Sequence, residues 1–165
     1  MTVDEQFYIY TLTDAGQGRR LASPLATDFT NQHGLCEQAM AGEFTSSSAD
    51  EDSPETFTAN PEVVRFLQWA LAKHAPAAPG FKERALADPE GSIFIVDIRG
   101  VHRGFEPKDE DLIGIVQLAG GQPRQFQASP NYKVLTEHGF LRIDPWLRQK
   151  YIEELQLHAL NKKQS

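Results

Sequence analysis

Two apolar segments separated by a charged loop constrain the fold of this chain more than any other feature. The first, 92-SIFIVDI-98, is rich in β-branched residues and predicts a strand that is buried on both faces for most of its length. The second, 112-LIGIVQL-118, predicts another strand. Because the intervening 99-RGVHRGFEPKDED-111 is charged and contains glycine, we expect the two strands to form an antiparallel hairpin with a long tip.

Two other segments carry the start signals of helices. The sequence 60-NPE-62 supplies a good N-cap, a proline suited to the first helical position and an acid in the first turn, and an apolar stripe at helical spacing follows it. The pair 144-DP-145 opens a C-terminal helix in the same way. A shorter helix is expected over 81-FKERALAD-88.

The rest of the chain predicts strands and loops around these elements. A first strand is expected over 6-QFYIYTLTD-14, a short helix over 34-GLCEQAMAGEF-44 and a loop over 119-AGGQPRQFQASPNY-132. A further strand is centred on Phe140 to Ile143. The order strand, helices, hairpin, strand, helix predicts an α+β fold with a mostly antiparallel central sheet flanked by helices.

Length and composition fit a single domain over residues 1–165. With 40% hydrophobic and 24% charged residues the composition is globular, and 165 residues can bury a core without disulfides. The segment around 46–58 is small, polar and acidic, and predicts a flexible surface loop. No apolar run approaches the ~20 residues that span a bilayer, and the N-terminus lacks the basic start of a secretory signal. We therefore expect a cytoplasmic protein without a membrane partner.

The net charge of −7 argues against general nucleic-acid binding, which needs a basic surface to release counterions. The charge is uneven along the chain. From Arg142 to the end there are five Lys or Arg and three Asp or Glu residues. An anionic ligand would therefore find the C-terminal segment the least hostile part of the molecule.

Common catalytic and metal-binding motifs do not occur in the sequence. It contains no GxxxxGK[ST], GxGxxG, HExxH or GxSxG pattern. The five histidines lack ligand spacing, and the single Cys36 excludes a cysteine-based zinc cluster, so we expect no metal site and assign no catalytic residue. The run 109-DED-111 has the charge to bind a cation, but a solvated hairpin tip is the simpler interpretation.

Four segments of the chain follow one another in the order of a known family. The phrase 60-NPEVVRFLQW-69 is similar to an N-P-E-V-x-R-Y-L-x-W opening, and 81-FKERALADPEGSIFIVDI-98 to the helix and first hairpin strand that follow it. The segment 112-LIGIVQL-118 is similar to the second hairpin strand, and 139-GFLRIDPWLRQKYIEELQLHAL-160 to the cofactor strand and helix. Taken in order, they resemble the ribosomal-protein N-acetyltransferase-like branch of the GNAT superfamily.

This resemblance implies an acetyl-CoA-dependent N-acetyltransferase, an acyltransferase that modifies an amine of a protein N-terminus or a small molecule. In that family the amides of the cofactor strand, here 141–143, stabilise the developing oxyanion. The following helix start, here 148–151, receives the pyrophosphate of acetyl-CoA. The implied cofactor-binding residues are Leu141, Arg142, Ile143, Arg148, Gln149, Lys150 and Tyr151.

The chain also departs from the family pattern. Where the family has R-G-x-G, this sequence has 148-RQKY-151, so side chains would crowd the phosphate and only Lys150 offers a compensating charge. The family's later strands would follow Ser165, so we expect a degenerate, C-terminally short member whose open sheet edge favours a homodimer. The alternative is an acidic cytosolic interaction or inhibitor protein without catalytic activity. In that case 142-RIDPWLRQKYIEEL-155 is only an N-capped helix start.

Overall fold

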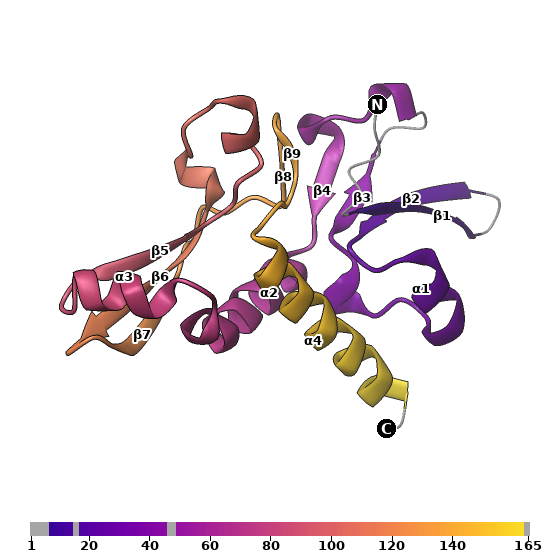
Figure 1. The fold of residues 1–165 in the computed structure, drawn as a ribbon. Helices are drawn as coiled ribbons and strands as arrows, with labels where there is room; N and C mark the ends of the chain where they lie inside the picture. The colour runs from indigo at the N-terminus through magenta and orange to yellow at the C-terminus, as the bar shows by residue number, and fades with distance from the viewer. Residues whose placement is uncertain (1–6, 15–16, 46–48, 164–165) are drawn as a thin grey trace. The chain divides into compact units, whose positions relative to one another are not determined.

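The computed structural model describes residues 7–14, 17–45 and 49–163, and these residues form an α+β fold (Figure 1). The predicted α+β class and the antiparallel pairing are therefore confirmed. The strands lie in three separate sheets of four, three and two strands and not in one central sheet. The α-helices in the described ranges are α1 (Thr27–His33), α2 (Pro61–His74), α3 (Phe81–Ala87) and α4 (Pro145–Lys163).

The chain divides into two compact units. Unit 1 comprises Met1–Phe66, Val134–Leu141 and Ile152–Ser165, and unit 2 comprises Leu67–Lys133 and Arg142–Tyr151. The prediction of a single domain stays a prediction. None of the helices in the described ranges is long and apolar enough to cross a membrane.

Unit 1 is built on the four-stranded antiparallel sheet, in the order β1-β2-β3-β4. Its strands are β1 (Tyr8–Asp14), β2 (Gln17–Ser23), β3 (Gly42–Phe44) and β4 (Phe57–Ala59). The strand predicted over residues 6–14 is confirmed as β1, with residue 6 outside the described ranges. The hairpin β8 (Leu135–Thr136) and β9 (Gly139–Phe140) also belongs to this unit. The strand expected around Phe140 to Ile143 therefore ends at Phe140.

Unit 1 contains a cluster of phenylalanines from four separate segments, in addition to buried aliphatic residues such as Leu21, Leu25 and Leu155. Phe7 and Phe140 stack with ring centroids 4.7 Å apart, and Phe44 and Phe57 lie 5.0 Å apart. The Phe140 ring meets Phe57 edge-on at 5.7 Å and Phe44 at 6.3 Å, which are favourable aromatic geometries. The cluster joins the sheet of unit 1 to the β8–β9 hairpin.

The short helix predicted over residues 34–44 is wrong. This segment forms a 3-10 turn at Glu37–Ala39 and then β3. The Asn60 side chain donates hydrogen bonds to the carbonyls of Glu37 and Met40, both at 2.9 Å, and so holds acceptors that a helix would use internally. A Cβ at Gly42 would meet the Phe57 ring, so this glycine allows the close approach of β4.

The acidic segment around 46–58 has regular structure where it is described. Residues 46–48 lie outside the described ranges. The rest forms 3-10 turns at Ala49–Glu51 and Pro54–Thr56 before β4. Asp52 pairs with the Arg20 guanidinium, with a distance of 2.6 Å between Nη1 and Oδ1. The predicted flexibility of this loop stays a prediction.

Unit 2 contains the three-stranded sheet, in the order β5-β6-β7. The predicted antiparallel hairpin is confirmed as β5 (Ser92–Val96) paired with β6 (Leu112–Ala119). The loop predicted over residues 119–132 is wrong because it contains β7 (Gln122–Ala128), paired with β6. The glutamines and the proline of this segment are typical of a loop. Proline has no N–H to donate, but Pro123 is tolerated because β7 is an edge strand.

The predicted burial of the 92–98 segment on both faces is also wrong. Ile93 and Ile95 are buried, at 2% and 7% exposure, but Phe94 between them is 53% exposed. An antiparallel sheet needs only one packed face. A phenylalanine at the exposed position hid this alternation in the sequence.

The predicted helix starts are confirmed by their caps. Asn60 Oδ1 accepts a hydrogen bond from the Glu62 N–H at 3.2 Å at the start of α2. Asp144 Oδ2 accepts one from the Leu147 N–H at 3.1 Å at the start of α4. The helix expected over residues 81–88 is confirmed as α3. Further 3-10 turns lie at Ala75–Ala77, Val101–Arg103 and Asp109–Asp111.

Candidate functional site

The residues that the sequence assigned to a cofactor differ widely in exposure. The side chains of Leu141, Ile143 and Tyr151 are buried, at 3%, 2% and 1% exposure. Gln149 is exposed, and the three cationic residues of the set are half-buried. The buried members pack in the core and do not offer their side chains to a ligand.

Two of the three backbone amides in the predicted oxyanion segment 141–143, those of Leu141 and Arg142, already have acceptors. The Leu141 N–H donates to the Val134 carbonyl at 2.8 Å. The Arg142 N–H donates to both carboxylate oxygens of Asp97, at 3.1 and 3.2 Å. A thioester carbonyl would have to replace these acceptors before it could use either amide as an oxyanion donor.

The start of α4 has the geometry of an ordinary capped helix. The Asp144 carboxylate accepts from the Leu147 N–H, and the Asp144 carbonyl accepts from the Arg148 N–H at 2.9 Å. A phosphate at this helix end would therefore meet a carboxylate of the same sign. Lys150 Nζ lies 5.4 Å from the centroid of the Trp146 ring, in cation–π contact with it.

A second candidate is a buried ionic group in unit 2, the Arg99 cluster, formed by Asp97, Arg99, Asp111 and Tyr132. The exposure of these four residues is between 1% and 6%. Arg99 Nε donates to Asp111 Oδ1 at 2.9 Å, and Arg99 Nη1 lies 3.6 Å from Asp97 Oδ2. The Tyr132 hydroxyl donates to Asp97 Oδ2 at 2.7 Å. The cluster therefore joins the end of β5 to the start of β6 and to the segment after β7.

Burial shifts the titration of two members of the Arg99 cluster. Loss of hydration raises the pKa of Asp97, although the Arg99 charge and the hydrogen bonds from Arg99, Tyr132 and Arg142 act in the opposite direction. Burial, and then the Asp97 charge, raises the pKa of the Tyr132 hydroxyl well above its usual value. Both groups are buried from solvent, at 1% and 6% exposure, so neither is open to a ligand.

The Arg99 cluster is internally satisfied. Each carboxylate oxygen of Asp97 and Asp111 accepts at least one hydrogen bond, and Arg99 Nη2 also donates to the carbonyls of Lys133 and Glu110. The interpretation of 109-DED-111 as a solvated tip is therefore wrong for Asp111. A signal was present in the sequence: an acid ends one apolar strand, another begins the next, and an arginine lies between them.

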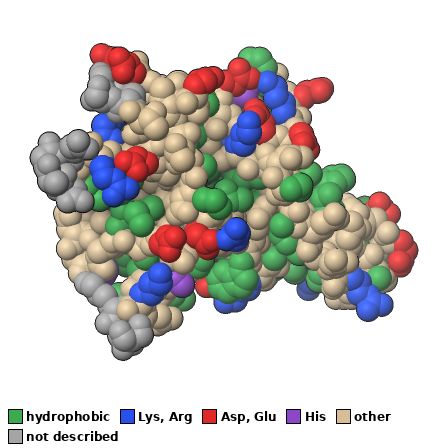
Figure 2. All heavy atoms as spheres, turned by 180° about the vertical axis from the view of Figure 1, so that it is seen from behind, with side chains coloured by type: hydrophobic (Ala, Val, Ile, Leu, Met, Phe, Trp, Pro, Cys, Tyr) green, Lys and Arg blue, Asp and Glu red, His purple; other side chains and the backbone are tan. Residues whose placement is uncertain are grey.

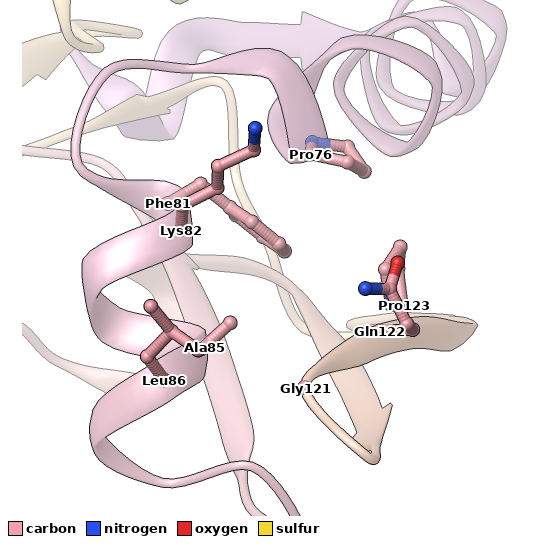
Figure 3. Close-up of a pocket in the computed structure, with 8 residues that line it drawn as sticks. All are labelled: Pro76, Phe81, Lys82, Ala85, Leu86, Gly121, Gln122 and Pro123. Carbon is pink, nitrogen blue, oxygen red and sulfur yellow. The ribbon is translucent and has the colours of Figure 1, made fainter.

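A third candidate is an open hollow in unit 2 of about 260 Å³ between α3 and the β6–β7 turn (Figure 3). Phe81 extends from the first turn of α3 toward the space beside Pro123 (Figure 3). Lys82 is the one charged residue of the lining, so the hollow offers apolar contact without a group of titratable side chains. The lining residues are Pro76, Phe81, Lys82, Ala85, Leu86, Gly121, Gln122 and Pro123.

Metal-binding and nucleophilic groups are sparse in the part of the chain that the structure describes. There, no group of three or more His, Cys, Asp or Glu residues is arranged to hold a metal ion. Cys36 is a half-buried free thiol. His158 Nε2 is buried and has no hydrogen-bond partner among the described residues, while its ring packs on Phe66 at 5.3 Å.

The charge is segregated between the two units. Unit 1 contains 5 Lys or Arg and 14 Asp or Glu residues, a net charge of −9, whereas unit 2 contains 11 and 9, a net charge of +2. Three of the unit 1 arginines pair with acids of the same unit: Arg19 with Glu43, Arg20 with Asp52 and Arg65 with Glu62. Acidic, basic and apolar side chains all reach the surface on the face drawn in Figure 2.

Four candidate regions therefore result: the start of α4, the Arg99 cluster, the hollow beside α3 and the acid-rich unit 1. The first is a capped helix start, the second is internally satisfied, the third is lined by one charged residue, and the fourth has negative charge in excess. No family model, curated protein or solved structure matches this chain.

Proposed function

We propose that this protein is a non-catalytic interaction protein whose acidic unit 1 binds a basic partner. The observation that carries the proposal is the segregation of charge, with −9 on unit 1 against +2 on unit 2. Complementary charge accelerates the encounter of two proteins and selects against partners of the wrong sign. All three arginines of unit 1 pair with acids of the same unit, and the acids Asp28, Glu37, Glu51 and Glu55 of this unit are exposed.

The internal use of charge in unit 2 supports the same proposal. Asp97, Arg99 and Asp111 satisfy one another and the nearby backbone, so these charged residues stabilise the fold and do not offer themselves to a substrate. The amides of Leu141 and Arg142 are likewise occupied. Binding through an acidic surface needs none of these groups.

The proposal is tested with a fluorescein-labelled peptide of ten lysines, whose binding is followed by fluorescence anisotropy. We expect binding that weakens as the salt concentration rises, because salt screens exposed charges. The triple variant Asp28→Asn, Glu37→Gln, Glu55→Gln removes three exposed acids of unit 1 and should weaken binding about tenfold. A peptide of ten glutamates should not bind.

The matched control removes three exposed acids of unit 2 with the variant Glu83→Gln, Asp88→Asn, Glu106→Gln. Both triple variants change the net charge from −7 to −4, so they differ only in where the charge is lost. We expect the control to bind within about twofold of the unmodified protein. Equal weakening by both variants, or no binding of the lysine peptide, would overturn the proposal.

A second candidate is the acetyl-CoA-dependent N-acetyltransferase that the GNAT resemblance implies. It is supported by the order α3, β5, β6 and α4 and by the cations Arg148 and Lys150 in the first turns of α4. In the three-stranded sheet β6 pairs with β5 and with β7, whereas residues 141–143 form no strand. The candidate predicts micromolar acetyl-CoA binding by calorimetry that weakens in Arg148→Ala and in Lys150→Ala. No heat of binding at millimolar acetyl-CoA would exclude it.

A further inference from the structure

We propose that the partner contributes an extended basic segment that adds to the outer edge of β1 as a fifth strand of the unit 1 sheet. This inference rests on the proposed function for the sign of the partner's charge. The strand β1 lies at one end of the sheet order β1-β2-β3-β4, and none of the described strands pairs with its outer side. An edge strand offers a row of backbone donors and acceptors to a second chain.

Among the described residues, the edge of β1 from Tyr8 to Thr13 shows none of the bulges, prolines or charges by which sheets block strand addition. Its seven residues pair with β2 from Tyr8 to Asp14 without a register shift, and 8-YIYTLT-13 contains no proline and no charge. The opposite edge, β4, is only three residues long. In unit 2 the edge strand β7 contains Pro123 and Arg124, and its pairing with β6 has a register shift. Short strands, prolines, charges and bulges are the usual protections of an edge.

The hydrogen-bond pattern of the sheet shows which backbone groups of β1 point outward. The Thr45 N–H donates to the Thr56 carbonyl on the β4 side at 2.7 Å, so the next residue back, Phe44, directs its backbone groups toward β2. Phe44 pairs with Arg20. The backbone N–H and C=O of Arg20 therefore point toward β3 and away from β1. Because Arg20 pairs with Thr11, the N–H and C=O of Thr11 point away from β2.

The side chains of β1 favour an extended and partly apolar occupant. Ile9 and Leu12 are 42% and 45% exposed, so apolar surface is available on both faces of this edge. The Tyr10 hydroxyl donates to the Leu25 carbonyl at 2.6 Å and anchors the strand to its own unit. Because unit 1 has a net charge of −9, the occupant that fits is a strand in which basic and β-branched residues alternate.

The probe is a labelled seven-residue peptide in which lysine alternates with threonine and valine. Its control has the same sequence and charge, with N-methyl groups on the amides of one edge. We expect the unmodified peptide to bind at least about tenfold more tightly than the N-methylated one, since strand addition needs those amides. Amide hydrogen exchange at Ile9 and Thr11 should slow when the unmodified peptide binds.

A pair of variants tests the same edge from the protein side. Thr11→Pro removes an outward N–H and should weaken binding of the unmodified peptide about tenfold, whereas Thr11→Val keeps the N–H and should leave binding unchanged. If Thr11→Pro fails to fold, strand addition is still tested on the unmodified protein by the amide exchange rates and by the comparison of the two peptides. Equal binding of both peptides with unchanged exchange at Ile9 and Thr11 overturns strand addition but leaves the acidic-surface proposal standing. If the seven-residue peptide does not bind while the ten-lysine peptide does, strand addition is likewise overturned. If neither peptide binds, the acidic-surface proposal is overturned as well.

Discussion

The two units of this protein place their charged residues in opposite ways. Unit 1 keeps two of its three arginine pairs at the surface, as in Arg19 with Glu43, whose side chains are 51% and 37% exposed, while Arg20 and Asp52 are 16% and 13% exposed. Unit 2 buries its central pair, Arg99 with Asp111, at 1% and 2% side-chain exposure. Unit 1 has a large net charge and unit 2 almost none. Charged residues at the surface of unit 1 are therefore available to a partner, whereas the buried charged residues of unit 2 stabilise the loop between β5 and β6.

The cores of the two units differ in a related way. Unit 1 packs phenylalanines from β3, β4, β9 and the residue before β1. Unit 2 buries aliphatic residues of β5 and β6 together with Phe81 and Tyr151, and adds the Arg99 cluster at the end of its sheet. The contribution of an aromatic cluster comes from buried area and ring geometry and does not depend on a charged partner. The Arg99 cluster depends on every partner being present.

The largest expected difference between the units is in the free energy of unfolding lost when the arginine of a buried or of an exposed ion pair is removed. Arg99→Ala would leave Asp97 and Asp111 buried without a cation, and we expect it to lower the free energy of unfolding by about 3–5 kcal/mol. The measurement is urea unfolding at neutral pH followed by circular dichroism. Arg99→Lys keeps the charge but loses the planar donor fork, so its loss should fall between those of Arg99→Ala and the unmodified protein.

The matched control is Arg19→Ala in unit 1. The Arg19–Glu43 pair has a distance of 2.9 Å between nitrogen and oxygen but lies in solvent, so its removal should cost less than about 1 kcal/mol. Similar losses in Arg19→Ala and Arg99→Ala would contradict the distinction between surface and internal charge. They would also remove the physical basis for treating the Arg99 cluster as structural.

Two glycines under phenylalanine rings give the second test. A Cβ at Gly42 in unit 1 would meet both the Phe57 ring and the Thr58 carbonyl oxygen, whereas a Cβ at Gly114 in unit 2 would meet only the Phe126 ring. A backbone oxygen moves less easily than a half-buried ring on an edge strand. We expect Gly42→Ala to cost about 2–3 kcal/mol and Gly114→Ala about 1 kcal/mol in urea unfolding. A larger loss in Gly114→Ala would show that β7 is held more firmly than β4.

The elements that sequence predicted correctly are those with local signals. The helix α2 combines an N-cap, a first-turn proline and a continuous apolar stripe, and its cap hydrogen bond from Glu62 to Asn60 is present. The β5–β6 hairpin was equally clear, because both strands are dense in branched aliphatic residues. In these elements nearest neighbours in the chain decide the structure.

The elements that sequence missed depend on distant partners. The strand β7 has the sequence of a loop and is held by pairing with β6. The strands β3 and β4 are three residues each and are held by Phe44, Phe57 and the side chain of Asn60. The sequence predicted Asp111 to be exposed to solvent because its neighbours are charged. In the structure it is buried and accepts a hydrogen bond from Arg99, twelve positions earlier. Tertiary contacts of this kind override local composition.

A change of pH should alter the stability contributions of Asp97 in unit 2 and Glu43 in unit 1 in opposite directions. These are the smallest of the expected changes. Burial raises the pKa of Asp97 above its ordinary 3.8, so the folded state holds the proton longer than the unfolded state. The stability that Asp97 contributes is therefore complete below that ordinary value and is lost as the pH rises through the raised pKa.

The hydrogen bond from Arg19 lowers the pKa of Glu43 below its ordinary 4.5, so its contribution is present above that value and is lost as the pH falls. Urea midpoints measured from about pH 3 to 7 should show both signs when each acid is replaced by its amide. As the pH rises, the stability of the unmodified protein relative to Asp97→Asn should fall, and that relative to Glu43→Gln should rise. If the relative stability changes in the same direction with pH for both variants, the charge and hydrogen bonds around Asp97 compensate its burial fully. The contrast between internal and surface charge would then rest on Arg99 alone.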